Sequence, residues 1–280
     1  MRKDGIVKHG DLVHIWAKFR KSPSEFESLA HTFMTLLQKM GVCFVVSEDD
    51  KKPFMVQRSI IPALLPDEPL SQRNDTGSVL CECWPRDPPF NRPVQIERIV
   101  KFSVVPGELV SRLLVQLHTY IQKSLVGKYE VVIVMEGSDE NTQGWIRVEP
   151  ERNRFVVMVR GSEVRYCIRL QEWILNQVKE VCSTHYLSVL ETKEEWIRSP
   201  HFSGSEIALT EVMSEVARGE NERVLMCPET RLPIRAEKLL MRAGMTIPTP
   251  TSTTISNTKV LSLGRTLDHL FLLEVEVEVE

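Results

Sequence analysis

The sequence lacks any apolar run long enough to cross a membrane. Its longest runs, residues 131–135 and 270–273, are far shorter than the roughly 20 apolar residues that a membrane-spanning helix needs. The opening string MRKDGIVKHGD has no apolar segment behind its charges, which argues against a secretory signal. We therefore expect a cytoplasmic protein with no membrane span.

An excess of one charge is also lacking. The chain has 35 Lys and Arg residues against 38 Asp and Glu residues, so its net charge is −3. Five of the acidic residues lie within residues 268–280, and without them the balance is 35 − 33, or +2. A body this close to neutral has no electrostatic reason to choose nucleic acid or an anionic membrane as its main partner.

Cysteine is sparse, with six residues in a chain of 280. A chain of this length can bury a sufficient apolar core without disulfides. We therefore expect reduced thiols, as in the cytoplasm, at Cys43, Cys81, Cys83, Cys167, Cys182 and Cys227.

The common catalytic motifs are missing. The sequence has no phosphate-binding P-loop, no protein-kinase set, no G-x-S-x-G nucleophile elbow and no H-E-x-x-H zinc pair. We therefore predict that the chain is not an enzyme, with no catalytic residue and no cofactor.

A weak metal signal leaves one enzymatic alternative open. Cys81 and Cys83 are separated by one residue, which fits poorly with the two-to-four-residue loops of structural zinc sites. Cys182 and His185 could complete a set of four ligands. A metal-dependent hydrolase built on these four residues is the less favoured alternative.

The first 61 residues predict a small lobe of helices followed by a hairpin. Ser22-Pro23-Ser24-Glu25 is typical of a helix start, and Gly41 of a helix end. A shorter helix is expected over residues 11–19, and β-type runs over residues 42–46 and 54–57. This order indicates a winged-helix-like unit. One apolar face is expected on the longer helix, formed by Phe26, Leu29, Ala30, Phe33, Leu37 and Met40.

Prolines interrupt the regular pattern after this lobe. Seven of the sixteen prolines lie within residues 62–93. Because proline removes a backbone donor and fixes φ, we expect residues 62–95 to form a connector, held to the surface by Leu64, Leu65 and Trp84.

Residues 96–190 predict a second lobe of sheet and helices. A strand is expected over residues 96–105, then a helix over residues 106–123. Short polar segments separate the β-type runs that follow, which favours antiparallel hairpins. A long helix over residues 170–189 ends the lobe, so the fold class is α+β. The expected β-type runs are residues 129–135, 144–149, 155–160 and 164–168.

The remainder predicts a helical appendage and a tail. Helices are expected over residues 205–218 and 232–243, the second ending at Gly244, within an appendage of residues 191–245. Residues 246–280 are rich in Thr and Ser and then in alternating Glu and Val, and we expect them to be a disordered acidic tail.

Several strings, taken in order, resemble the COR region of Roco proteins, which follows a Ras-like GTPase called Roc. Residues 102–118, FSVVPGELVSRLLVQLH, are similar to the family string F-x-(F/L)-(L/V)-P-x-G-L-x-S-R-L-I-x-R-L-H. Residues 54–66, FMVQRSIIPALLP, resemble (Y/F)-L-(I/V)-P-x-L-L-P, and residues 155–161, FVVMVRG, resemble I-x-I-x-V-R-G. Further matches lie at residues 5–16 and 33–46. The chain departs from the pattern at Gln116, where the family has Arg.

The resemblance implies a non-catalytic module for dimerisation and coupling. In the family, the second lobe pairs chains into dimers, and the junction of the lobes transmits the nucleotide state of the GTPase. The implied partners are therefore a Roc-type GTPase domain and a second copy of the chain. Residues 98–103 match the strand that faces the GTPase. The candidate interface residues are Arg98, Val100, Phe102, Arg112, His118 and Trp145.

The first lobe also leaves a nucleic-acid-binding winged helix open as an alternative. Its basic residues are opposed by acidic ones, so no basic stripe is evident. The basic set is Lys8, Lys18, Arg20, Lys21, Lys39, Lys51, Lys52 and Arg58, and the acidic set is Glu25, Glu27, Glu48, Asp49 and Asp50.

Overall fold

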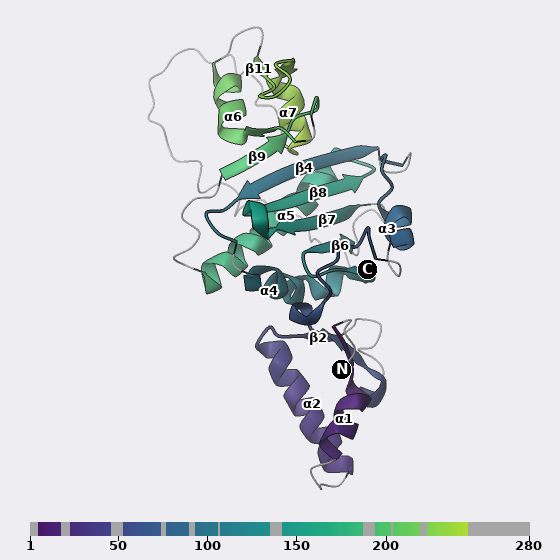
Figure 1. Ribbon diagram of the computed structural model, residues 1–280. Coiled ribbons are helices and arrows are strands. Elements are labelled where there is room, and N and C mark those ends of the chain that lie inside the picture. Colours follow the sequence, from purple (N-terminus) through teal and green to yellow (C-terminus); the bar gives the residue numbers. More distant parts are fainter. Residues whose placement is uncertain are drawn as a thin grey trace, which may run out of the picture. The chain divides into compact units, whose positions relative to one another are not determined.

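A computed structural model confirms the α+β class (Figure 1). It describes residues 5–17, 23–45, 53–73, 77–89, 93–105, 107–134, 142–186, 194–202, 204–218 and 223–245. All of these belong to one compact unit, which spans Met1–Ile247. The expected acidic tail, residues 246–280, lies outside the described residues.

The first lobe has the expected two helices followed by two strands, and a further strand that the sequence analysis did not predict precedes the helices. Strand β1 (Ile6–Lys8) leads into α1 (His9–Ala17) and α2 (Pro23–Lys39), and then into β2 (Phe44–Val45) and β3 (Arg58–Ile60). The three strands form an antiparallel sheet in the order β1-β3-β2. The predicted strand over residues 54–57 is wrong, because Phe54–Val56 form a 3-10 turn, η2, and the strand begins at Arg58.

Helix α2 ends where the sequence predicts. Gly41 has φ +70°, and the N–H groups of Gly41 and Val42 donate to the carbonyls of Gln38 and Leu37, both at 2.9 Å. This pair of hydrogen bonds satisfies carbonyls that the last helical turn leaves open. The helix therefore stops through local chemistry that can be read from the sequence.

The single apolar face predicted for α2 is wrong. Ala30 and Met34 are buried, whereas Leu29, Phe33 and Met40 are exposed. Helix α2 packs against α1 and the η2 turn, which cover one side of it, so the remaining apolar residues face outward.

The connector carries more regular structure than predicted. A 3-10 turn, η3 (Pro62–Leu64), precedes a helix, α3 (Gly77–Cys83), that the sequence analysis missed. Trp84 is buried with Leu70 and Leu80 against the main sheet. Leu65 is also buried, but Leu64 is exposed, so the latter does not anchor the connector.

A seven-stranded antiparallel sheet forms the centre of the protein. Its strand order is β10-β9-β4-β8-β7-β6-β5. The antiparallel hairpins predicted between β6 and β7 and between β7 and β8 are therefore confirmed. The bounds are β4 (Val94–Lys101), β5 (Ile121–Val126), β6 (Glu130–Val134), β7 (Gln143–Glu149), β8 (Arg154–Gly161), β9 (Glu194–Arg198) and β10 (Glu206–Ala208).

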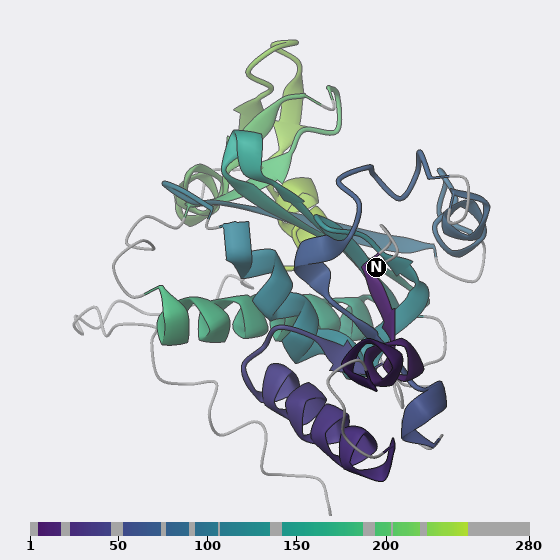
Figure 2. The ribbon, with the colours of Figure 1, turned by 60° about the horizontal axis from the view of Figure 1, so that its bottom comes forward.

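Two helices, α4 (Gly107–Leu117) and α5 (Val164–His185), pack on one face of this sheet (Figure 2). Leu113, Leu170 and Ile174 lie with strand residues such as Val157 in the largest apolar cluster. This face therefore holds the main core.

Two predicted elements of the second lobe are wrong. The helix expected to reach residue 123 ends at Leu117 and is followed by a 3-10 turn, η4 (His118–Tyr120), and then by β5. The strand expected over residues 164–168 is the start of α5. Its Val, Tyr and Ile residues favour a strand locally, but helical spacing places Cys167 and Leu170 on the core, and this packing overrides the local propensity.

Residues 191–245 differ from the predicted helical appendage. Strands β9 and β10 extend the central sheet, and a two-stranded ribbon, β11 (Val224–Met226) and β12 (Pro233–Arg235), accompanies α6 (Leu209–Ala217) and α7 (Ala236–Arg242). The segment has its own apolar cluster, which includes Val212 and Leu239. Strand β9, with the sequence EEWIR, lacks an apolar alternation, and its pairing with β4 defines it.

Candidate interaction surface on the outer face of the sheet

The two faces of the central sheet differ in chemistry. Successive residues of a strand point to opposite faces of a sheet. The strands bury one set of residues, such as Val157, against α5, so the alternate residues point to the face away from α5. We call this other side the outer face. It carries apolar residues such as Ile99 and Val156 and the side chains of Trp84, Trp145 and Trp196. A set of charged residues lies on the same face.

The connector covers part of the outer face. The Trp84 and Trp145 rings meet edge to face, with centroids 5.6 Å apart. The Arg160 guanidinium lies 4.5 Å from the Trp84 ring centroid, and its Nε donates to Gln95 Oε1 at 2.6 Å. These contacts fix residues 84–86 against the strands.

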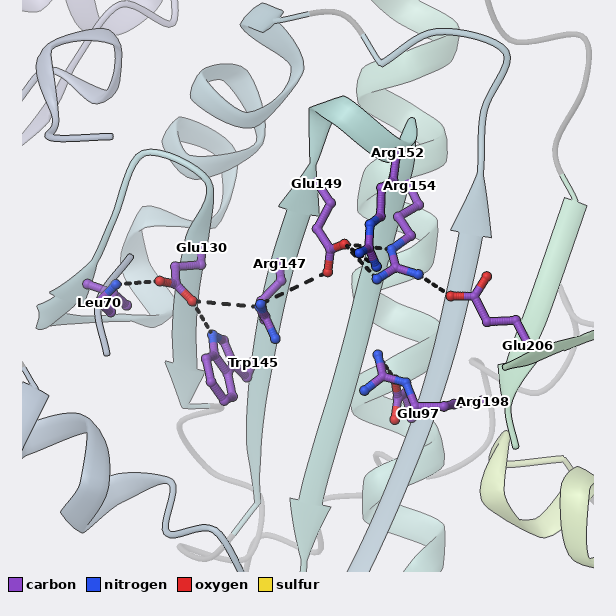
Figure 3. A network of polar contacts seen from close by, with 10 residues as sticks. All are labelled: Leu70, Glu97, Glu130, Trp145, Arg147, Glu149, Arg152, Arg154, Arg198 and Glu206. Atoms are coloured by element: carbon purple, nitrogen blue, oxygen red, sulfur yellow. Dashed lines mark hydrogen bonds and ion pairs between the residues drawn. The ribbon is translucent and has the colours of Figure 1, made fainter. Parts of the chain in front are cut away.

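A chain of ion pairs crosses the strands beside this covered part (Figure 3). We call it the ionic strip, and it consists of Glu130, Arg147, Glu149, Arg154, Glu206 and Lys101. Arg154 donates from Nε to Glu149 Oε2 at 2.7 Å and pairs on its other side with Glu206. Lys101 Nζ lies 2.9 Å from Glu206 Oε2, and Arg147 Nη2 lies 4.0 Å from Glu149 Oε1.

Strand register explains why these charges meet. Glu130 is directly opposite Arg147 across the β6–β7 pair, and Glu149 is opposite Arg154 across the β7–β8 pair. Lys101 is opposite Arg154 across the β4–β8 pair, which brings two like charges together, and Glu206 pairs with both of them. Opposite charges directly across two strands stabilise a sheet. Arg147 and Glu149 on β7 therefore become part of a strip because the neighbouring strands place residues of opposite charge beside them.

Two cations, Lys101 and Arg147, are the most exposed members of the strip, whereas Arg154 is as deeply buried as its partner Glu206. The side chains of Glu130 and Glu206 are each 10% exposed, whereas those of Lys101 and Arg147 are 33% and 40% exposed. Arg152, which lies 3.8 Å from Glu149, is 66% exposed. The strip therefore presents cationic groups to solvent above buried carboxylates, and it suits an acidic partner surface.

Tryptophans lie at both ends of the strip. Trp145 Nε1 donates to Glu130 Oε2 at 3.2 Å, and the Arg147 guanidinium lies 5.3 Å from the Trp145 ring centroid. At the other end, Lys101 Nζ lies 3.6 Å from the Trp196 ring centroid, a close cation–π contact. The rings restrict the two cations and so hold them in place.

A buried ion pair lies next to the strip. Arg198 Nη2 is 2.9 Å from Glu97 Oε1, and the Glu97 side chain is almost fully buried. Burial raises the pKa of the Glu97 carboxyl, and the positive charge of Arg198 opposes this rise. The ionised form of Glu97 therefore carries a desolvation cost that Arg198 offsets only in part.

Three of the predicted interface residues lie inside the protein. Val100 and Phe102 belong to the main apolar cluster between the sheet and its helices. Arg98 is also buried, and it donates from Nη1 to Glu172 Oε1 at 2.8 Å and from Nη2 to the Ala243 carbonyl at 3.0 Å. The proposed interaction surface therefore leaves these three residues out.

The other three predicted residues are separated from one another. Arg112 Nη1 lies 3.4 Å from His185 Nδ1 on the helical side of the sheet. His118 Nδ1 lies 2.6 Å from the Val115 carbonyl oxygen, and its ring packs 5.6 Å from that of Phe44. Of the six predicted residues, Trp145 alone lies beside the ionic strip.

The four candidate metal ligands do not form a site. Cys83 packs with the cluster on the outer face, whereas Cys182 is buried on the opposite face, against the core of α5. The described residues contain no group of three or more His, Cys, Asp and Glu side chains that could hold a metal ion. The hydrolase alternative therefore loses its proposed ligand set.

Two other expectations can be compared with the described residues. None of the helices described is long and apolar enough to cross a membrane.

The six cysteines are free thiols, and burial raises the pKa of Cys43 and Cys167 to about 11. Those two thiols are therefore poor nucleophiles at neutral pH.

Comparison with known proteins adds no assignment, because no family model matches the sequence and no curated protein matches it. The resemblance to the COR region accordingly rests on the sequence strings.

Proposed function

We propose that this chain is a non-catalytic interaction module of the COR type, which binds a Ras-like GTPase domain and relays its nucleotide state. The ordered sequence strings support the kind of partner. The observation that carries the proposal is the ionic strip, because it forms a rigid charged surface on five strands of one sheet, and its most exposed members are cations.

The strip has the properties that a docking surface needs. Its charged side chains already hold fixed positions through ion pairs and ring contacts, so binding costs little additional side-chain entropy. Its exposed cations lie at the rim of a buried aromatic cluster, and charge at such a rim mainly sets association rate and specificity. We therefore propose that the ionic strip binds an acidic surface of the GTPase domain.

Binding to a Roc-type GTPase domain tests this proposal. We would titrate the full chain into that domain, loaded with GDP or with a non-hydrolysable GTP analogue, and measure the affinity by calorimetry at two salt concentrations. We expect affinity to depend on the nucleotide and to fall as salt rises, because exposed charges are screened.

Charge reversal locates the surface. The double variant R147E/R152E should weaken binding about tenfold or more, since it reverses one exposed cation of the strip and a second exposed cation beside Glu149. The control is R218E, at the C-terminal cap of α6, whose side chain is as exposed as that of Arg152. Absence of binding in both nucleotide states, or equal weakening by R218E, would contradict the proposal.

Two further parts of the proposal rest on sequence. A homodimer formed through the second lobe stays a prediction that solution mass measurements can test. A cytoplasmic location is supported by the free thiols, since disulfides are rare in that compartment.

The nucleic-acid alternative finds no support in the described residues. A reading helix would present basic and polar groups, whereas the outward side of α2 presents Leu29, Phe33 and Leu36. Lys18, Arg20, Lys21, Lys51 and Lys52, on which that alternative partly depended, lie outside the described residues.

A further inference from the structure

Helix α2 presents an exposed apolar stripe made of Leu29, Phe33, Leu36 and Met40. These side chains are between 40% and 59% exposed, while Ala30 and Met34 on the inner side of the helix are buried. An α-helix turns about 100° per residue, so the four residues fall within an arc of about 60°. Met40 continues the helical pattern, because its N–H donates to the Leu36 carbonyl at 2.9 Å.

The spacing of the stripe is that of a helix-pairing seam. The intervals between its residues are four, three and four, the alternation found at the a and d positions of coiled coils. Such a seam packs against another helix that carries a matching seam. The occupant must therefore present an apolar helical stripe of about three turns.

The stripe is complementary to itself. Because the intervals read the same in both directions, an antiparallel copy places Leu29 opposite Met40 and Phe33 opposite Leu36, in both halves of the pair. A two-fold symmetric contact requires this kind of self-complementarity. We propose that α2 pairs in antiparallel orientation with α2 of a second copy of this chain.

The charges at the two ends of α2 favour the antiparallel orientation. Glu25 lies in the first turn of the helix and Lys39 in its last turn. Antiparallel pairing brings the acidic end of each helix beside the basic end of the other and opposes the two helix dipoles. Parallel pairing would instead bring like charges together.

The area of the stripe predicts a weak dimer. Its four side chains expose roughly 400 Å² per copy, taking about 200 Å² for a whole large side chain. Two copies would therefore bury about 800 Å² of apolar surface, which is below the ~1,200 Å² of ordinary stable complexes. We expect reversible association with a dissociation constant in the micromolar range or above.

Sedimentation of the full chain tests the pairing. The mass should rise towards that of a dimer between about 1 and about 300 μM, the range expected for a small interface. The variant L36E/M40E should lose the association through α2, because it places carboxylates in the seam at two exposed positions. A dimer formed through the second lobe would persist in this variant. The control V56E alters an equally exposed apolar residue outside α2 and should still dimerise. M40E alone, with its circular dichroism recorded, serves if the double variant unfolds.

Cysteine trapping tests the orientation. In a background with the exposed Cys81 replaced by Ser, L29C/M40C should form a covalent dimer under mild oxidation. L29C alone should not, because the two copies of residue 29 lie about 16 Å apart along antiparallel helices. A chain that stays monomeric, a dimer unaffected by L36E/M40E, or efficient trapping of L29C alone would each overturn the proposal. These outcomes do not depend on whether a GTPase binds.

Discussion

The buried guanidinium of Arg98 on β4 lies 2.8 Å from the partly exposed carboxylate of Glu172 on α5. The same guanidinium donates to the Ala243 carbonyl at the end of α7, and Glu195 on β9 lies 3.5 Å away. One side chain thus joins the sheet, the long helix and the C-terminal segment. Arg98 is a cross-link within the chain, although the sequence string suggested an interface.

Removing this cross-link should destabilise the protein. We expect R98A to cost about 2–4 kcal/mol of unfolding free energy, because it leaves a buried carbonyl without its donor and removes packed side-chain atoms. E172Q should cost less than about 1 kcal/mol, because the Glu172 side chain is 43% exposed. Urea unfolding measures both values. Equal costs for the two variants would contradict the prediction, because E172Q removes one exposed partner whereas R98A removes the whole cross-link.

Gly41 and Gly244 allow the cost of backbone strain to be distinguished from the cost of steric crowding when each is replaced by alanine. Gly41 and Gly244 both end helices with positive φ, at +70° and +72°. An added Cβ at Gly41 would meet no atom within 4 Å, whereas at Gly244 it would lie 2.7 Å from Ile96 Cδ1 and 2.9 Å from Gln171 Oε1. We expect G41A to cost about 1–2 kcal/mol from conformation alone, and G244A to cost at least about 1 kcal/mol more.

Thermal and urea unfolding of the two alanine variants provide the comparison. G41A acts as the matched control, since it changes the backbone preference in the same conformation without a steric neighbour. Equal losses for both variants would show that the core around Ile96 absorbs the added methyl group without cost.

The buried carboxyl of Glu97 should make stability depend on pH. Burial raises its folded-state pKa above the ordinary value of 4.5, despite the opposing charge of Arg198. The stability associated with the protonated form is fully present below pH 4.5 and is lost as pH rises through the folded pKa. In E97Q this loss is absent.

Urea unfolding of wild-type protein and E97Q across pH 4 to 8 measures this effect. The stability of E97Q relative to wild type should increase with pH above about 4.5, by about 1.4 kcal/mol for each unit by which the pKa is raised. E149Q, at a more exposed carboxylate of the strip, is the control. A difference between E97Q and wild type that is constant with pH would contradict the prediction.

Helix ends and hairpins were predictable because their causes are local. Gly41 and Gly244 end helices through hydrogen bonds formed within five residues of chain. Short polar segments between apolar runs correctly predicted the antiparallel order of β6, β7 and β8. The register of Glu149 against Arg154 follows from the same hairpin, so part of the ionic strip could have been found from the sequence.

The rest depends on partners distant in sequence. Glu206 meets Arg154, and Trp196 meets Lys101, only because β9 and β10 add to the edge of the sheet beside β4. The burial of Arg98, the exposure of Leu29 and Phe33, and the helical state of residues 164–168 likewise follow from which surfaces pack together. The local turns, the helix ends and the short polar segments that separate neighbouring strands thus follow from the amino-acid sequence alone. Long-range packing settled which residues form the core and which form its surfaces, because burial is a property of the whole fold.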